Sequence, residues 1–547
     1  MNSGSLPEAQ AAEKTYPELR SWSLVLAGIS ILDMLLLIVL VTEHAAQPAL
    51  VPVADLAPFV YLLTGASVLA TSLGVLWVFL RYPKQRKVIL VLLAITLGLM
   101  VAHLYTINDP ATPSCYGSNG VQGCVMDEIY YVPAAQALLS GEKCGPYLDN
   151  CNLEHPFLGK GFIAAGIALF GNNDFGWRFF EGLLGTLSIP IVFYICLKFT
   201  KDTTLSLYAA FLLAFETFFF VQSSIAVIDI QMIFLGLVAF LAYLADIKFG
   251  ILNRYVVSGL LLGLCILAKE IGVFLAAFLI FYNLAFGSGT FKHRVVTSVG
   301  MSVIAFLLFI GGLQLYDSLY GTPQSSTFVQ DISYILSYGA SLKGGGWSVF
   351  ANSQPPYITP LYWFIYYFPI SYDVVRVTVS SGTGSFSYVS AGYFGVPDLF
   401  ETWFVYIWVP YVVYLAYKKW KARIAAAAAP ALAAIVGSVQ LTLEGIPIRG
   451  TEAAEADAYE LGKFAVMWLA FTFVPYILLY AYGRVTYPYY ILSGTPALAI
   501  GMAYAMTRKW FPREVVYIML GGVFAWFFIF YPDKSFLPTQ LRVLLGH

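Results

Sequence analysis

The chain has 547 residues, of which 59% are hydrophobic and only 11% are charged. Soluble domains carry about 25% charged residues, so this composition excludes an ordinary soluble fold. The formal net charge of −1 provides no basic field that would attract nucleic acid, and no nucleic-acid partner is expected. The sequence also contains no zinc-like Cys/His spacing, glycine-rich phosphate loop or internal repeat.

Apolar runs near the length that crosses a bilayer as a helix recur along the chain. They predict an all-α, multi-pass integral membrane protein with about 13 transmembrane helices. The Ala-rich run 424–441 is interpreted as re-entrant or interfacial, because a further crossing would place the basic segment 507–513 outside. Residues 1–21 lack a signal-peptide cleavage site, so the first span is expected to remain as an anchor. The candidate spans are 22–43, 58–81, 87–107, 178–198, 204–222, 226–247, 255–269, 271–287, 295–316, 397–417, 461–481, 486–506 and 514–531.

The orientation follows from lysine and arginine in the short loops, which favour the cytoplasm. The run "RYPKQRK" at 81–87 is the strongest such cluster. Placing these clusters inside puts the N-terminus in the cytoplasm. It puts the two long polar segments, 108–177 and 317–396, on the outer face.

Four of the six cysteines lie in the first of these polar segments. Clustered cysteines in a polar loop indicate disulfides and an oxidising exterior. Three pairings are open, and proximity favours Cys115–Cys124 with Cys144–Cys151; four free thiols are the alternative. The other two cysteines, Cys196 and Cys265, fall in apolar runs, where a thiol acts as a small hydrophobe.

The stretch 126–142, "MDEIYYVPAAQALLSGE", predicts a helix lying along the membrane surface. Asp127 and Glu128 stand at its start, where the helix dipole favours acids, so a simple cap is one interpretation. The other is chemical, because a carboxylate in an outer loop can serve as a general base.

The motif "EHPFLGK" follows, then a short apolar segment that is expected to form a second surface helix. Lys160 of this motif and Arg178 at the next span would lie at headgroup depth. Taken singly, Lys160 fits a lysine that snorkels to the interface, and Arg178 fits an interfacial anchor. Together with His155 and the acidic pair, they suit a lipid-linked phosphate, which arginine binds bidentately.

The second polar segment contains "DVVRVTVSSGTGSFSYVSAG" at 373–392. Its alternation around Gly-Thr-Gly predicts a β-hairpin. The hairpin could form part of a groove for an acceptor polypeptide, with an edge strand pairing to it. A lid over irregular backbone is the other interpretation.

The Asp-Glu pair, the later His-Pro-x-Leu-Gly-Lys and the arginine opening the next span resemble the protein O-mannosyltransferase family. Phe157 replaces the family's second proline, and Ser224 stands where the family usually has arginine. Weaker resemblances follow in three further segments. The first, 259–276, has a glycine-rich part that ends at a lysine; the others are 353–368 and 482–501. The likeness extends over residues 90–530.

The resemblance implies a C-type glycosyltransferase fold over 87–547, with 1–86 adding a tail and two further helices. Segment 108–177 would be catalytic and 317–396 would face the acceptor. The latter is too short for the β-trefoil insertion of fungal and animal members. The lack of this insertion favours a prokaryotic plasma membrane, with the active site on the extracytoplasmic side.

The implied reaction moves mannose from a polyprenyl (dolichyl) phosphate mannose to Ser or Thr hydroxyls of exported proteins, with inversion. Asp127 would be the base. Arg178, then Lys160 and Arg484, would bind the phosphate. Glu128 would orient the acceptor or hold an arginine. The partners implied are the donor lipid, the acceptor polypeptide and membrane lipids; no cofactor is implied, and a divalent metal and the oligomeric state are left open.

Several alternatives remain open at this point. His155 fits a structural hydrogen-bonding role as well as substrate binding. Asp229 fits a helix cap and equally a functional role, because a carboxylate within a membrane segment is a functional candidate. Lys269 and Glu270 are interpreted as pairing with each other and are left out of the site. A related transferase could act on a lipid or glycan, although its motif usually begins Lys-Pro-Pro. A lipid transporter is disfavoured, because charge gathers in one outer loop.

Overall fold

The computed structural model describes residues 85–109, 125–143, 151–245, 247–249, 252–321, 327–343, 359–365, 370–381, 384–436, 451–508 and 511–531. The predicted spans 22–43 and 58–81 therefore lie outside the described residues, and so do Cys115, Cys124 and Cys144.

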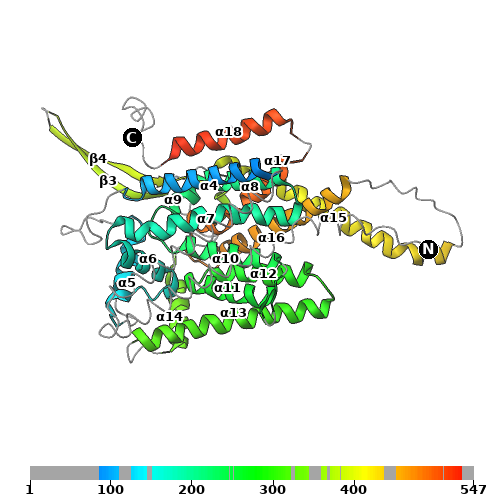
Figure 1. Cartoon of the computed structure of the whole chain (residues 1–547), viewed down its shortest axis with the longest axis horizontal. Helices are drawn as coiled ribbons and strands as arrows, with labels where there is room; N and C mark the ends of the chain where they lie inside the picture. Colours follow the sequence, from blue (N-terminus) through cyan, green and yellow to red (C-terminus); the bar gives the residue numbers. More distant parts are fainter. Residues whose placement is uncertain are drawn as a thin grey trace.

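The described chain is a bundle of long helices, as the apolar runs predict (Figure 1). Within the described ranges, six helices are long and apolar enough to cross a membrane. These are α4 (Arg86–Thr106), α7 (Asp174–Thr200), α13 (Phe291–Tyr320), α15 (Leu399–Val436), α16 (Thr451–Ala481) and α18 (Arg513–Phe530). Shorter apolar helices complete the bundle: α6 (Phe157–Phe170), α8 (Thr203–Phe215), α10 (Asp229–Leu244), α11 (Arg254–Ala268), α12 (Gly272–Phe286) and α17 (Thr495–Met506). The all-α membrane fold is confirmed, whereas the predicted count of 13 crossings stays a prediction.

Helix α10 forms the centre of the bundle and is buried along almost its whole length. It packs against α7 on one side and α11 on the other. Helix α11 in turn lies against α13 at short range, because its face there carries glycine. A Cβ at Gly263 would lie 2.8 Å from the Ala305 carbonyl oxygen. Small residues allow this approach where lipid supplies no hydrophobic drive between helices.

Two predicted spans have different boundaries in the structure. The run 204–222 is broken into α8 and α9 (Thr217–Gln222) at Glu216, whose carboxylate caps α9 by accepting from the Phe219 N–H at 2.5 Å. The second difference concerns 424–441. Helix α15 continues without a break from Leu399 to Val436, so the separate re-entrant segment expected there is wrong over 424–436.

One end of the bundle, here called the loop end, gathers the polar segments (left in Figure 1). It contains α5 (Glu128–Ser140), α6 and the amphipathic helix α14 (Phe328–Ser341), which the sequence analysis did not predict. It also contains the predicted hairpin, formed by β3 (Ile370–Ser381) and β4 (Gly384–Gly395), whose register places Val377 opposite Tyr388. The remaining short elements are β1 (Lys248–Phe249), β2 (Leu252–Asn253), η5 (Pro360–Tyr362) and η6 (Pro488–Gly494).

Candidate active site

A cavity of about 1540 Å³ opens at the loop end. Its walls come from the start of α5, the loop before α6, the break between α11 and α12, helix α14, and the turn from α16 into η6. Segments far apart in sequence therefore meet around one space. Its charged lining residues are Asp127, Glu154, His155, Lys269, Glu270, Lys343 and Arg484.

Asp127 lies at the position that precedes α5, yet its side chain makes no capping hydrogen bond to the helix. The cap interpretation of this residue is therefore not supported, and its carboxylate borders the cavity instead. Burial raises the pKa of Asp127, Lys269 and His155 oppose that rise, and Asp229 adds to it. A carboxylate of raised pKa in a cavity is suited to accept a proton.

Glu128, the next residue, points the other way and is completely buried. Its carboxylate accepts from Arg178 Nε at 2.7 Å and Nη2 at 2.9 Å, and from the backbone N–H groups of Val125 and Ala226. Arg178 also donates from Nη1 to the Ile107 carbonyl at 3.1 Å. The pair thus fastens the turn that carries Asp127 onto α7 and the end of α4.

This placement changes the expected role of Arg178. Its guanidinium is 0% exposed and is engaged in a bidentate pair with Glu128. It is not among the residues that line the cavity. The geometry supports the reading that Glu128 holds an arginine, and it supports a positioning rather than a phosphate-binding role for Arg178.

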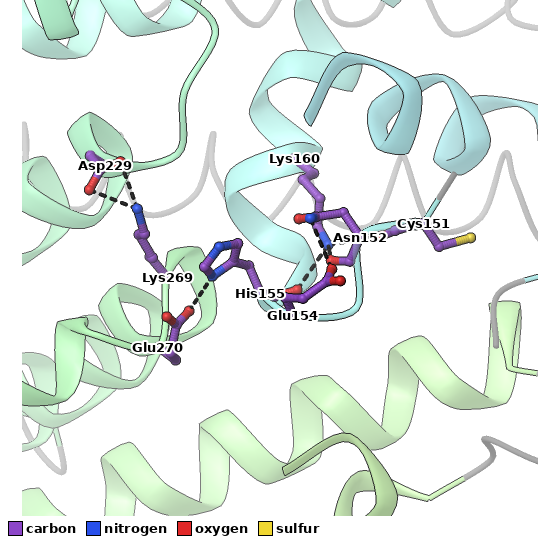
Figure 2. Close-up of polar contacts among 8 residues, drawn as sticks. All are labelled: Cys151, Asn152, Glu154, His155, Lys160, Asp229, Lys269 and Glu270. Carbon is purple, nitrogen blue, oxygen red and sulfur yellow. Dashed lines mark hydrogen bonds and ion pairs between the residues drawn. The ribbon is translucent and has the colours of Figure 1, made fainter. Parts of the chain in front are cut away.

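Lys160 also lies away from the cavity lining and is buried under the loop before α6. Its Nζ donates to the carbonyls of Cys151 at 3.1 Å, Asn152 at 2.6 Å and His155 at 2.9 Å (Figure 2). Burial lowers the pKa of Lys160 to about 7. Three carbonyls use all three N–H groups of an ammonium, so Lys160 acts as a brace that fixes the loop carrying His155.

Lys160→Met is expected to lower the free energy of unfolding by about 1–3 kcal/mol, because buried carbonyls would lose their donor. Thermal melting of the full chain in lipid or detergent measures this. Lys421→Met, which changes an exposed lysine on α15, is the matched control and should melt like wild type. Equal melting of the two variants would contradict the bracing role.

Two ion pairs involve the candidate site residue His155 and three residues left outside the predicted site, Asp229, Lys269 and Glu270 (Figure 2). Lys269 Nζ contacts both carboxylate oxygens of Asp229, at 2.9 and 2.8 Å. Glu270 Oε2 lies 2.7 Å from His155 Nδ1. The expectation that Lys269 and Glu270 pair with each other is therefore wrong. The sequence signal that could have identified them is their position, two charges at a break between apolar runs.

Arg484 lines the cavity beside Lys343, to which it is joined by an antiparallel backbone bridge. Its guanidinium packs over Gly339, and its buried Nε has no hydrogen-bond partner within the part of the chain that the structure describes. Arg484 thus offers donors toward the cavity, as its predicted role requires.

The remaining predictions concern single residues. Ser224, where the family usually has arginine, bonds His103 Nδ1 at 2.9 Å inside the bundle. Phe157 stacks on Tyr316 of α13, with ring centroids 5.1 Å apart. Cys196 and Cys265 are buried free thiols, as expected. Cys151 is disulfide-bonded, and because the other three loop cysteines are not described, both predicted pairings stay predictions.

A metal site was left open by the sequence. Among the described residues, no group of three or more His, Cys, Asp or Glu side chains is placed to hold a metal ion.

Comparison with known proteins finds similarity to one family over part of the chain. Residues 154–313 match the family model described as dolichyl-phosphate-mannose-protein mannosyltransferase. A polyprenol-phosphate-mannose–protein mannosyltransferase of Mycobacterium tuberculosis is 33% identical over 122 residues, which are 22% of this chain and 23% of that protein. A protein of the same name from Corynebacterium glutamicum is 23% identical over 269 residues, covering 40% of this chain and 51% of the relative.

Two solved structures are similar at low identity. The S. cerevisiae protein O-mannosyltransferase Pmt1–Pmt2 complex bound to the sugar donor gives a TM-score of 0.49 at 10% identity, over 82% of this chain and 90% of that chain. ArnT from Cupriavidus metallidurans bound to undecaprenyl phosphate gives a TM-score of 0.40 at 14% identity, over 79% of this chain and 62% of that chain.

The apolar helical bundle indicates an integral membrane protein, and a large charged cavity lies at its loop end. The family-model match and the curated relatives show that part of this chain is similar to the protein O-mannosyltransferase family. The matched segment spans about a quarter of the mycobacterial relatives and about half of the corynebacterial one.

Proposed function

We propose that this chain is an inverting glycosyltransferase that moves mannose from a polyprenyl-phosphate mannose to Ser or Thr hydroxyls of exported proteins. The reaction takes place on the extracytoplasmic face. The observation that carries the proposal is Asp127, a carboxylate that makes no capping bond and borders a large cavity with cations on its floor and rim. The names of the curated relatives support the choice of mannose, polyprenyl phosphate and a protein acceptor.

The reaction follows from the residues at the cavity. A Ser or Thr hydroxyl is a weak nucleophile and needs a base within hydrogen-bond reach. Asp127 takes the hydroxyl proton as the acceptor oxygen forms its bond to the anomeric carbon. The bond from that carbon to the phosphate oxygen breaks, and its electron pair leaves with the lipid phosphate. One displacement of this kind inverts the anomeric centre.

The departing phosphate needs cations rather than a general acid, because its charge grows as the bond breaks. Arg484 takes this role in the proposal, assisted by Lys343 across the bridge that joins them. Arginine offers donors in a planar fork that matches phosphate oxygens. Exposed apolar side chains at the cavity, such as Val273 on α12 and Leu336 on α14, suit the first isoprene units of the donor.

The proposal is tested with the full chain in lipid, a radiolabelled polyprenyl-phosphate mannose and an acceptor peptide. We expect label to pass to a Ser/Thr peptide and not to its Ala counterpart, with release of polyprenyl phosphate. NMR of the product should show the anomeric configuration opposite to that of the donor. Transfer to water or to lipid alone, or retention of configuration, would contradict the proposal.

Arg484→Gln is expected to raise the donor KM roughly 10- to 100-fold, since hydrogen bonds to a charged group contribute about 1.5–3 kcal/mol. Initial rates at varied donor concentration measure the change. Arg513→Gln replaces an exposed arginine at the start of α18 and is the matched control, expected to leave the donor KM unchanged. A wild-type donor KM for Arg484→Gln would remove Arg484 from the donor site.

A further inference from the structure

The floor of the cavity carries two ion pairs of similar design. Each pair holds a cationic or potentially cationic side chain, Lys269 or His155, against a carboxylate other than Asp127. The backbone explains why adjacent residues serve different partners. Lys269 is extended, with φ −155° and ψ 136°, and successive side chains of an extended chain point to opposite sides. Lys269 therefore reaches the first residue of α10, whereas Glu270 reaches the loop before α6 (Figure 2).

Both basic side chains line the same cavity as Asp127. Each of them lowers the pKa of Asp127 electrostatically, whereas burial raises it. Yet their closest polar contacts are with Asp229 and Glu270, at 2.8 and 2.7 Å. Burial works to raise the pKa of Glu270, but the contacts with His155 and Lys269 hold it below its ordinary value, which keeps this carboxyl ionised.

The position of the His155 ring is fixed from several directions. Glu270 holds Nδ1, the ring edge lies against Tyr131 with centroids 5.7 Å apart, and Lys160 Nζ binds the His155 carbonyl at 2.9 Å. When Glu270 accepts from Nδ1, the other ring nitrogen is left for the cavity. His155 thus has one nitrogen held and one available.

We propose that Glu270 and Asp229 are positioning residues that hold His155 and Lys269 just off Asp127, so that its carboxylate keeps its lone pairs for the acceptor hydroxyl. A free ammonium or imidazolium beside a carboxylate forms a short, charge-assisted hydrogen bond. Such a contact would occupy the base. The two ion pairs preserve the electrostatic effect of the cations on Asp127 but prevent that direct contact. They also connect α10, the α11–α12 break and the first polar segment.

The inference rests on the proposed function and is tested by a double-mutant cycle on Glu270 and His155. Glu270→Gln should lower kcat about 10-fold and leave the donor KM within about 2-fold, because the residue acts through His155 and not on the donor. In a His155→Asn background the same change should cost almost nothing. Glu270→Asp, which keeps the charge, should recover part of the loss. Glu460→Gln, a partly exposed carboxylate paired with Lys463, is the control and should transfer at the wild-type rate.

An equal loss on Glu270→Gln with and without His155 would overturn the proposal. A raised donor KM at unchanged kcat would also overturn it, because Glu270 would then contact the donor. Melting of each variant identifies loss of folding, and Glu270→Asp remains informative if Glu270→Gln does not fold.

A second measurement does not depend on activity. The chain has five histidines, so protein with isotope-labelled histidine gives few imidazole signals, and His155→Asn assigns the relevant one. The Nδ1 signal of His155 should show a hydrogen bond to carboxylate in the wild type and change in Glu270→Gln but not in Glu460→Gln. An unchanged signal would refute the ion pair between His155 and Glu270. A wild-type chain that transfers no mannose but shows the bonded signal would refute the proposed function and retain the pairing.

Discussion

Asp127→Asn is expected to reduce kcat for mannosyl transfer by about 10³-fold, within the range that a positioned general base contributes. The amide has nearly the same shape as the carboxylate but cannot accept the hydroxyl proton. Folding should not suffer. Burial raises the pKa of Asp127, so the charged form is the one that the folded state disfavours, and an uncharged amide removes that cost. Transfer rates and thermal melting of the same preparation measure both effects.

The matched control is Asp202→Asn, the same chemical change outside the cavity. Asp202 caps α8 through the backbone N–H groups of Thr204 and Leu205, and asparagine is an equally good N-cap. Asp202→Asn should therefore have the wild-type transfer rate and melting temperature. In the wild type, activity should fall as the pH drops through the raised pKa of Asp127, at a higher pH than the value of about 3.9 for an ordinary aspartate. Asp127→Asn activity within about tenfold of wild type would contradict the base assignment.

The sequence was sufficient for the features that depend on local pattern. Apolar runs of membrane length identify α4, α7, α13, α16 and α18, and strand alternation identifies the hairpin at 373–392. These signals lie within one element, where residue spacing and burial are directly linked. Asp127 was proposed as the base because it opens a predicted helix in a polar segment, ahead of a motif that resembles a known family.

Pairings between distant residues could not be predicted in the same way. Arg178 and Glu128 are 50 positions apart, and His155 and Glu270 are 115 apart. A sequence shows that a charge is present near a membrane boundary, but the partner depends on how helices pack. Arg178 and Lys160 were therefore assigned to a phosphate, although each finds its acceptors inside the protein.

Boundaries failed where a side chain overrides the hydropathy pattern. Glu216 lies inside an apolar run, and its capping bond to the Phe219 N–H divides that run into two helices. The opposite occurs in α15, where lysines at 418–421 suggested a loop between two segments. Their exposed side chains are compatible with a helix, and the chain continues through them.

Arg178→Ala is expected to cost about 3–5 kcal/mol of folding free energy, because it leaves Glu128 buried without its countercharge. The effect should be far larger than for an exposed pair, which contributes at most about 1 kcal/mol. Thermal or denaturant unfolding measures this, with Arg513→Ala as the exposed control. Transfer should fall as well, because Glu128 secures the turn that carries Asp127.

The double variant Glu128→Met/Arg178→Met separates charge from packing. Replacing both members of a buried pair with apolar residues of similar volume is often close to neutral for stability, whereas removing one member is not. The double variant should therefore melt nearer to wild type than Arg178→Ala does. Its transfer rate should stay low, because methionine cannot accept from the Val125 and Ala226 N–H groups that position the turn. If Arg178→Ala instead melted like wild type and raised only the donor KM, Arg178 would belong to the donor site, and its pairing with Glu128 would not be what holds Asp127 in place.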